Sequence, residues 1–210
     1  MRTIALTVFI LAISVAAFGQ KSPDRAKQAA ADLKRLLDLR AKLEKIPFNS
    51  EEKEPHKSFI KANEKSIVYN DPAGQWIVKS ELFWDLREKY SDLAIADDIA
   101  WQAAQNPIPG ECEGYMNCGV YLSQTTSVRY LSYYPAGKHS KAALAELKDW
   151  YGSYADAAQA GTSYTPPEDA SDKAELQKML KEIDAVLAKT TGADAAAVRG
   201  YIKTIADRYK

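Results

Sequence analysis

The fold is decided by the stretch FWDLREKY at residues 83–90, which is followed by SDL at 91–93 and by AIADDIAW at 94–101. Bulky apolar residues three and four apart predict a helix with one broad apolar face over the first segment. The last segment carries a narrower face of alanine and isoleucine. Alanines let two helix axes approach closely while the aromatic rings of the neighbouring helix fill the groove between them. The stretch therefore predicts a helical hairpin with a tight turn.

A related unit occurs further along the chain. It consists of VRYLSYY at 128–134, PAGK at 135–138 and SKAAL at 140–144. Aligning Tyr90 with Tyr134 gives an offset of 44 residues. In both copies an aromatic-ended helix breaks at a short turn before an alanine-rich helix, which is the pattern of helix-turn-helix repeats.

The rest of the chain shows mostly the same helical spacing of apolar residues, and little of it alternates with the period of a strand. A loop is expected between Asn106 and the helix that follows it, and Tyr154 to Pro167 is expected to be a fraying helix end and a connection. The expected helices run from a start at Ser22-Pro23-Asp24 to Pro47, from Trp76 to Tyr90, from Ala94 to Ala104, near Tyr121 to Tyr134, from Lys138 to Tyr151, from Asp169 or Ser171 to a C-cap at Gly192, and from Asp194 to Tyr209.

These helices predict an all-α fold built of antiparallel helix-turn-helix hairpins. One hairpin leaves an apolar face uncovered, so stacking of hairpins into a short α-solenoid is expected. The predicted divisions are a signal peptide at 1–19, an N-terminal helical segment with a charged linker at 20–70, a repeat core at 71–160 with a cysteine loop at 110–119, and a C-terminal helical hairpin at 168–210.

The segment from Trp76 to Trp150 resembles tetratricopeptide-like (TPR-like) repeats, especially the divergent form of bacterial envelope proteins. That form occurs in the outer-membrane barrel-assembly lipoprotein and the Tol-Pal coordinator. There, the first helix often ends in a tyrosine-proline pair before a short turn and an alanine-containing helix. Tyr134-Pro135 fits this pattern, whereas Tyr90-Ser91 lacks the proline. The resemblance implies a protein-binding scaffold without catalytic residues.

The first residues have the layout of a secretory signal. Arg2 precedes the apolar run Ile4 to Phe18, and small residues end this run at Gly19, so cleavage is expected before Gln20. The run is short for a membrane-spanning helix of roughly 20 residues. A periplasmic or secreted location is therefore expected, with a retained membrane anchor as the alternative. No later segment is apolar enough to span a membrane.

The two cysteines of the sequence, Cys112 and Cys118, are six residues apart. In an exported protein two cysteines are most simply paired with each other, so a disulfide is expected here. A structural zinc site would need further ligands, and His56 and His139 are distant in sequence. We therefore expect no metal and no cofactor.

The charges balance but are unevenly distributed. Without the signal, 27 basic and 28 acidic residues remain, which gives no basic excess to suggest nucleic acid. Residues 21–65 hold 12 basic and 8 acidic side chains, while residues 81–114 hold 2 basic and 8 acidic ones. These segments could attract each other within the chain, mark different partner faces, or be solvated helix surfaces.

A search for catalytic constellations finds no G-x-S-x-G, H-E-x-x-H or glycine-rich phosphate motif, so an enzyme is not expected. The acids near the cysteine loop could in principle hold calcium, but they lack the spacing of a calcium loop and are expected to be solvated. These acids are Asp97, Asp98, Glu111 and Glu113.

Tyrosine and tryptophan are concentrated between residues 115 and 154. Rings with a polar tip suit an interface or a sugar-stacking groove, although they could simply fill the space between helices. The leading prediction is an exported, non-catalytic adaptor for a protein or peptide partner in the envelope, and the alternative is a small-ligand or glycan binder, with or without a metal ion. The first candidates for partner contacts are Trp84, Trp101, Tyr130 and Tyr133.

Overall fold

The structure is a computed structural model that describes residues 23–161 and 164–210, and within them it is mainly helical with one two-stranded sheet. The predicted signal peptide at 1–19 lies outside the described residues. The elements are, in order, α1 (Pro23–Leu43), α2 (His56–Asn63), β1 (Ile67–Asn70), β2 (Gln75–Val78), α3 (Ser80–Lys89), α4 (Ile95–Ala104), α5 (Met116–Thr125), α6 (Ser127–Tyr133), α7 (Ser140–Ala160), α8 (Ala170–Leu187) and α9 (Ala193–Arg208).

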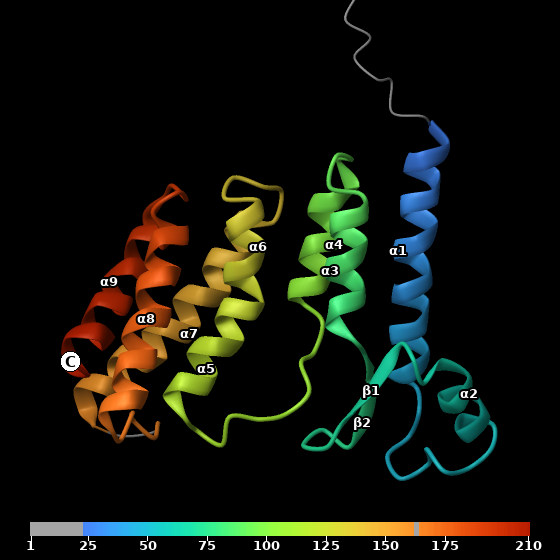
Figure 1. The fold of residues 1–210 in the computed structure, drawn as a ribbon, viewed down its shortest axis with the longest axis horizontal. Helices are drawn as coiled ribbons and strands as arrows, with labels where there is room; N and C mark the ends of the chain where they lie inside the picture. Colours follow the sequence, from blue (N-terminus) through green and yellow to red (C-terminus); the bar gives the residue numbers. More distant parts are fainter. Residues whose placement is uncertain (1–22, 162–163) are drawn as a thin grey trace, which may run out of the picture.

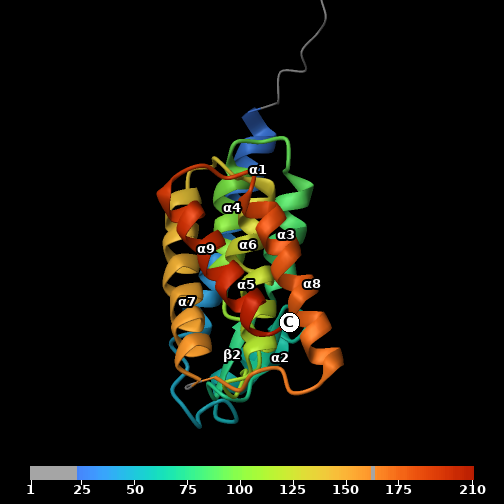
Figure 2. The same ribbon diagram turned by 90° about the vertical axis from the view of Figure 1, so that its left-hand side faces the viewer.

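The helices stand side by side along the long axis, from α1 at one end to α9 at the other (Figure 1). Helix α3 packs on α1 and α4, α4 packs on α6, and α7 packs on both α6 and α9. Viewed along the row, α7 and α8 lie on opposite sides of the broken helix α5–α6 (Figure 2). The buried apolar side chains form one continuous core through all these layers. No helix in the described part of the chain is both long enough and apolar enough to cross a membrane.

The β-hairpin is the main departure from the expected all-α fold. Trp76 does not open a helix, because residues 75–78 pair antiparallel with residues 67–70, with Val68 opposite Ile77 and Tyr69 opposite Trp76. The hairpin turn lies at residues 71–74, where Gly74 has a positive φ of 59°. Strands of four residues are too short for an alternating pattern to stand out against helical spacing.

The first predicted hairpin is confirmed as α3 and α4. Helix α3 buries Phe83, Trp84 and Leu86, and Tyr90 follows it as a buried C-cap. Helix α4 turns its alanines and Ile99 into the core. The broad aromatic face thus packs against a narrow alanine face, as the sequence indicated.

The predicted helix from Tyr121 to Tyr134 is wrong in its extent. Helix α5 begins earlier, at Met116, and the chain breaks at Thr126, whose φ and ψ are −112° and −106°. The Thr126 hydroxyl donates to the Leu122 carbonyl, and the Thr126 N–H donates to the Ser123 carbonyl. Local hydroxyl bonds of this kind compete with the helix ladder. Tyr121, in the middle of α5, is 54% exposed.

Two helix ends also differ from expectation. Helix α7 continues to Ala160, so Tyr154 is buried in the core and is not part of a fraying end. Helix α8 ends with Ala188 as its C-cap, and Gly192, with a φ of 117°, directly precedes α9. The predicted N-cap at Asp169 is confirmed, since its side chain accepts a hydrogen bond from the Asp172 N–H.

The predicted disulfide is confirmed between Cys112 and Cys118. Cys118 lies inside α5, so the bond ties the incoming loop to the first turn of that helix. Beside it, the Met116 N–H donates to the Thr165 carbonyl and the Thr165 N–H donates to the Gly114 carbonyl. The cysteine loop is thereby fixed to the connection between α7 and α8.

Gly119 in α5 leaves room for the side chain of Tyr154 from α7. A Cβ atom placed on Gly119 would lie 1.7 Å from the Tyr154 hydroxyl oxygen. Tyr154 is buried and packs edge-on against Tyr164, with ring centroids 4.5 Å apart, so it cannot move aside freely. The helix pair therefore requires glycine at this position.

Gly119→Ala should lower the free energy of unfolding by about 2 kcal/mol, because overpacking a filled core typically costs 1–3 kcal/mol. The matched control is Gly200→Ala in α9, where a new Cβ meets nothing within 4 Å. That change should raise stability by about 0.5–1 kcal/mol through helix propensity. Urea unfolding of both variants gives the measurement, and equal stability of the two variants would contradict the predicted contact.

Candidate interaction surfaces

The four residues predicted to contact a partner lie at the junction between the hairpin α3–α4 and the segment α6–α7. Trp84 is 6% exposed and Tyr130 is fully buried, so these two rings pack within the chain and are not available to a partner. Trp101 is partly buried. Tyr133 is 41% exposed and is the predicted residue that the surface presents most openly.

Trp84 and Tyr133 belong to a ladder of alternating aromatic and cationic side chains from α3 and α6. The Arg87 guanidinium carbon lies 3.8 Å from the Tyr133 ring centroid, and that of Arg129 lies 4.2 Å from the Trp84 ring centroid. The two rings are 6.1 Å apart. Cation–π contacts of this kind stabilise a junction by about 0.5–1 kcal/mol each when partly exposed. The ladder thus fixes α6 beside α3 through side chains.

Trp101 and Tyr130 belong to a second cluster, where α4 meets the turn before α7. The Tyr130 hydroxyl donates to Asp97 at 2.5 Å and accepts from the His139 N–H at 3.0 Å. The His139 ring stacks on Trp101 at 5.2 Å and contacts Asp98 through Nε2 at 2.8 Å. Burial first, and then the neighbouring Asp97 carboxylate, raises the pKa of Tyr130, because both disfavour a charged phenolate.

The acids considered as calcium ligands do not gather at the cysteine loop. Asp97 and Asp98 lie in the first turn of α4 and bind Tyr130, Lys138 and His139. Glu111 and Glu113 are exposed in the loop before α5. Within residues 23–161 and 164–210, no group of three or more potential ligands is arranged to hold a metal ion.

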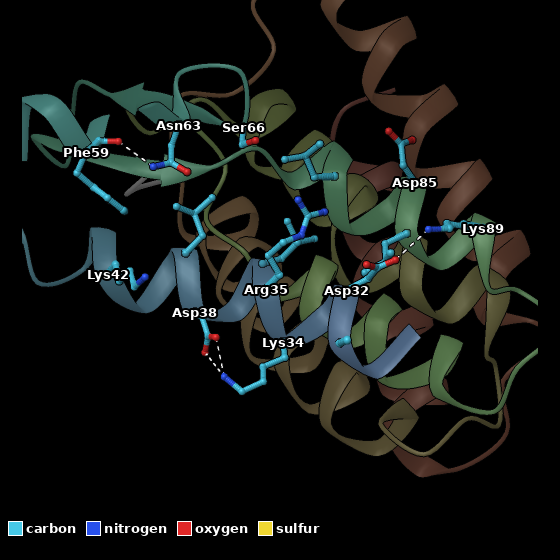
Figure 3. A pocket seen from close by; sticks show the side chains of 15 residues that line it. Asp32, Lys34, Arg35, Asp38, Lys42, Phe59, Asn63, Ser66, Asp85 and Lys89 are labelled. Atoms are coloured by element: carbon cyan, nitrogen blue, oxygen red, sulfur yellow. Dashed lines mark hydrogen bonds and ion pairs between the residues drawn. The ribbon is translucent and has the colours of Figure 1, made fainter. Parts of the chain in front are cut away.

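A groove of about 600 Å³ runs between α1, α2 and α3 (Figure 3). Its floor is apolar, and its rim carries charges of both signs. The floor is formed by Leu36, Leu39, Phe59, Leu82 and Leu86. Along α1 the groove extends from Ala31 to Lys42, which is about 16 Å at 1.5 Å per residue.

Some rim charges are neutralised within the chain and others are not. Lys34 pairs with Asp38 on the outer side of α1 (Figure 3). Arg35 reaches from α1 toward α3, and neither Arg35 nor Lys42 forms an ion pair within the described residues (Figure 3). Within the described residues the groove therefore presents two unpaired cations, Arg35 and Lys42, and one unpaired acid, Asp85, around an apolar floor.

One end of the groove is closed by Asp32. Its carboxylate accepts hydrogen bonds from Lys89 at 2.9 Å and Tyr90 at 2.8 Å, and a third from Gln28. Lys89, followed by Tyr90, lowers the pKa of Asp32 to about 2 from an ordinary value of 3.8. A second link is the ion pair of Arg25 in α1 with Asp92 in the turn after α3. The Arg25–Asp92 pair joins a cation of the basic N-terminal segment to an acid of the acidic middle, whereas in the Asp32–Lys89 pair the acid belongs to the N-terminal segment.

Little in the sequence alone indicates this groove. The sequence shows an excess of basic residues in the N-terminal segment. It does not show that Arg35 and Lys42 border the same groove as Leu82, because that depends on how α1 packs on α3. Phe59 lies in α2, a short helix whose apolar pattern in the sequence is weak.

Comparison with known proteins supplies no further assignment. No protein-family model, curated protein or solved structure matches the chain.

Tyr130→Phe should lower the free energy of unfolding by about 2 kcal/mol at neutral pH, because a hydrogen bond to a charged group is lost and the His139 N–H loses its acceptor. Since the folded-state pKa of Tyr130 is raised, its stabilising effect is present below pH 10 and is lost as the pH rises through the folded pKa. Tyr121→Phe removes an exposed hydroxyl and is the control. Urea unfolding at pH 7 should separate the two variants, and equal stability would argue against the network.

Asp32→Asn should lower stability at neutral pH and make stability less sensitive to acid. Because the folded pKa of about 2 lies below the ordinary value of 3.8, the stabilising effect of Asp32 is present above pH 3.8 and is lost as the pH falls toward 2. The free energies of unfolding of wild type and variant, measured by urea unfolding at several pH values, should therefore converge between pH 3.8 and pH 2. Asp85→Asn, which removes a carboxyl without ion pairs from the same groove, is the control and should not produce this convergence.

Proposed function

We propose that this chain is an exported, non-catalytic helical scaffold that binds a protein or peptide partner in the cell envelope. The observation that carries the proposal is the groove between α1 and α3, with its apolar floor and the cations Arg35 and Lys42 on its rim. Such a groove accepts a helix or an extended segment whose apolar side chains fill the floor. Acidic residues beside that apolar face complement the two cations.

A TPR-like arrangement is the second part of the proposal. The pairs α3–α4, α6–α7 and α8–α9 each pack as neighbours in sequence, and α4–α6 and α7–α9 contacts join successive pairs. These contacts support a short stack of hairpins, in which each pair covers the apolar face of the next. The β-hairpin and the break at Thr126 make the units unequal.

An envelope location is the third part. The disulfide between Cys112 and Cys118 supports an oxidising compartment, because disulfides form and persist outside the cytosol. The apolar segment Ile4–Phe18 supports export by the layout of its residues.

The groove can be tested by charge reversal with a matched control. Arg35→Glu with Lys42→Glu reverses both rim cations, whereas Lys27→Glu with Lys45→Glu makes the same change in net charge outside the groove. A photoreactive residue at position 39, on the groove floor, traps whatever occupies it in an envelope extract, and one at position 27 serves as the reference.

We expect a specific crosslinked species from position 39 alone, reduced about tenfold by the groove variant and unchanged by the control, since charge complementarity governs association. Melting temperatures should show that both double variants fold. A crosslink that both double variants reduce equally would reflect net charge and would contradict the groove as the binding site. A species that forms equally from position 27 would also contradict it.

A further inference from the structure

A second pocket, of about 340 Å³, lies on the other side of α3 from the α1–α3 groove. It is bounded by β1, the first turns of α3, the loop after α4, and the exposed face of α5–α6. Half of its ten lining residues are apolar or aromatic. The lining includes Lys79, Trp84, Ile108, Pro109, Tyr121 and Arg129.

We propose that this pocket binds a peptide segment through an aspartate or glutamate side chain, with the neighbouring peptide residue packed against Ile108, Pro109 and Tyr121. The proposal concerns a site separate from the α1–α3 groove. It adds a recognition element for acidic residues on the opposite side of α3.

The charges of the pocket favour an anionic group. Arg129 has no carboxylate partner within the described residues, and its guanidinium lies over the Trp84 ring. Lys79 Nζ donates to the Lys65 carbonyl and forms no ion pair either. Glu81 is the single acid of the lining, and it is exposed and pairs with neither cation. An arginine held flat on an aromatic ring still offers the edge of its planar fork to a carboxylate.

The apolar wall of the pocket is held in place before any ligand arrives. Asn106 is buried and its Nδ2 donates to the Val78 carbonyl at 2.8 Å and to the Ser80 hydroxyl at 2.9 Å. The Gly110 N–H donates to the side-chain oxygen of Asn70 at 3.1 Å. These bonds anchor both ends of the segment that carries Ile108 and Pro109. A wall fixed in this way reduces the ordering cost of binding.

Tyr121 supplies the exposed aromatic surface. It is 54% exposed, and it forms no hydrogen bond within the described residues. An exposed tyrosine beside a proline and a cation is typical of a contact residue in a protein interface. A peptide fits this mixture better than a sugar, because the Trp84 ring face is already covered by Arg129 and only one ring is open for stacking.

The test is a selection of random nonapeptides displayed on phage. The bait is Arg35→Gln with Lys42→Gln, which removes the cations of the α1–α3 groove so that this groove cannot account for the result. The same selection is run on that bait with Arg129→Gln added, and on that bait with Arg208→Gln added as the matched control. Melting temperatures establish that all three baits fold.

We expect peptides enriched in aspartate or glutamate from the bait and from the Arg208→Gln control, and no such enrichment after Arg129→Gln. A selected peptide should bind about tenfold more weakly to the Arg129→Gln protein, and Glu→Gln in the peptide should have the same effect. Amide shifts on titration should centre on Tyr121 and Lys79.

Three outcomes overturn the proposal. The first is a selection without acidic enrichment. The second is an enrichment that survives Arg129→Gln. The third is binding of a glucuronate oligosaccharide that depends on Arg129 while no peptide is enriched, which would assign the pocket to an acidic glycan. Each outcome is distinct from failure of the α1–α3 groove, which is already disabled in the bait.

Discussion

The hydroxyl group of Tyr130 is the constraint on which the junction of this molecule depends. It is buried between the hairpin α3–α4 and the turn that leads into α7, and there it joins the Asp97 carboxylate to the backbone of His139. Leaving a buried polar group without its hydrogen-bond partner costs more free energy than the bond itself contributes, so both partners must stay in place. Gly137 belongs to the same constraint, because a Cβ there would lie 2.7 Å from this hydroxyl and 2.8 Å from Asp97. The tight turn between α6 and α7 therefore holds these two helices against α4.

This junction also fixes the surroundings of α3. One face of the helix, with Leu82 and Leu86, forms part of the groove with α1, and the face with Trp84 meets α6 and the second pocket. The position of α3 is set on one side by the bonds of Asp32 and on the other by the arginine–aromatic ladder. Both candidate surfaces are consequently assembled from rigid elements and need little ordering when a ligand binds.

The sequence predicted the elements that carry a strong local signal. Apolar spacing of three and four residues gave the helical hairpins, and Asp169 was recognisable as a cap. The two short strands were missed, because four residues carry too little pattern, and their pairing of Tyr69 with Trp76 is a contact between residues on opposite sides of a turn. Thr126 breaks a helix through hydroxyl bonds that compete with the ladder, and nothing in the spacing of its neighbours reveals this. The aromatic cluster was predicted as a whole, but spacing alone could not separate the buried ring of Tyr130 from the exposed ring of Tyr133.

The same limit applies to the two candidate surfaces, which depend on how the helices pack. Arg35, Lys42 and Arg129 are ordinary basic residues in the sequence, and what distinguishes them is that none forms an ion pair within the described residues while each borders apolar surface. Lys34 and Lys89 are equally basic, yet each is neutralised by an aspartate within the chain. Because an unneutralised cation above apolar surface is stabilised when an anionic partner covers it, the pattern of pairing, rather than the number of charges, indicates where a partner binds. The two surfaces proposed above, on either side of α3, both combine such a cation with apolar surface.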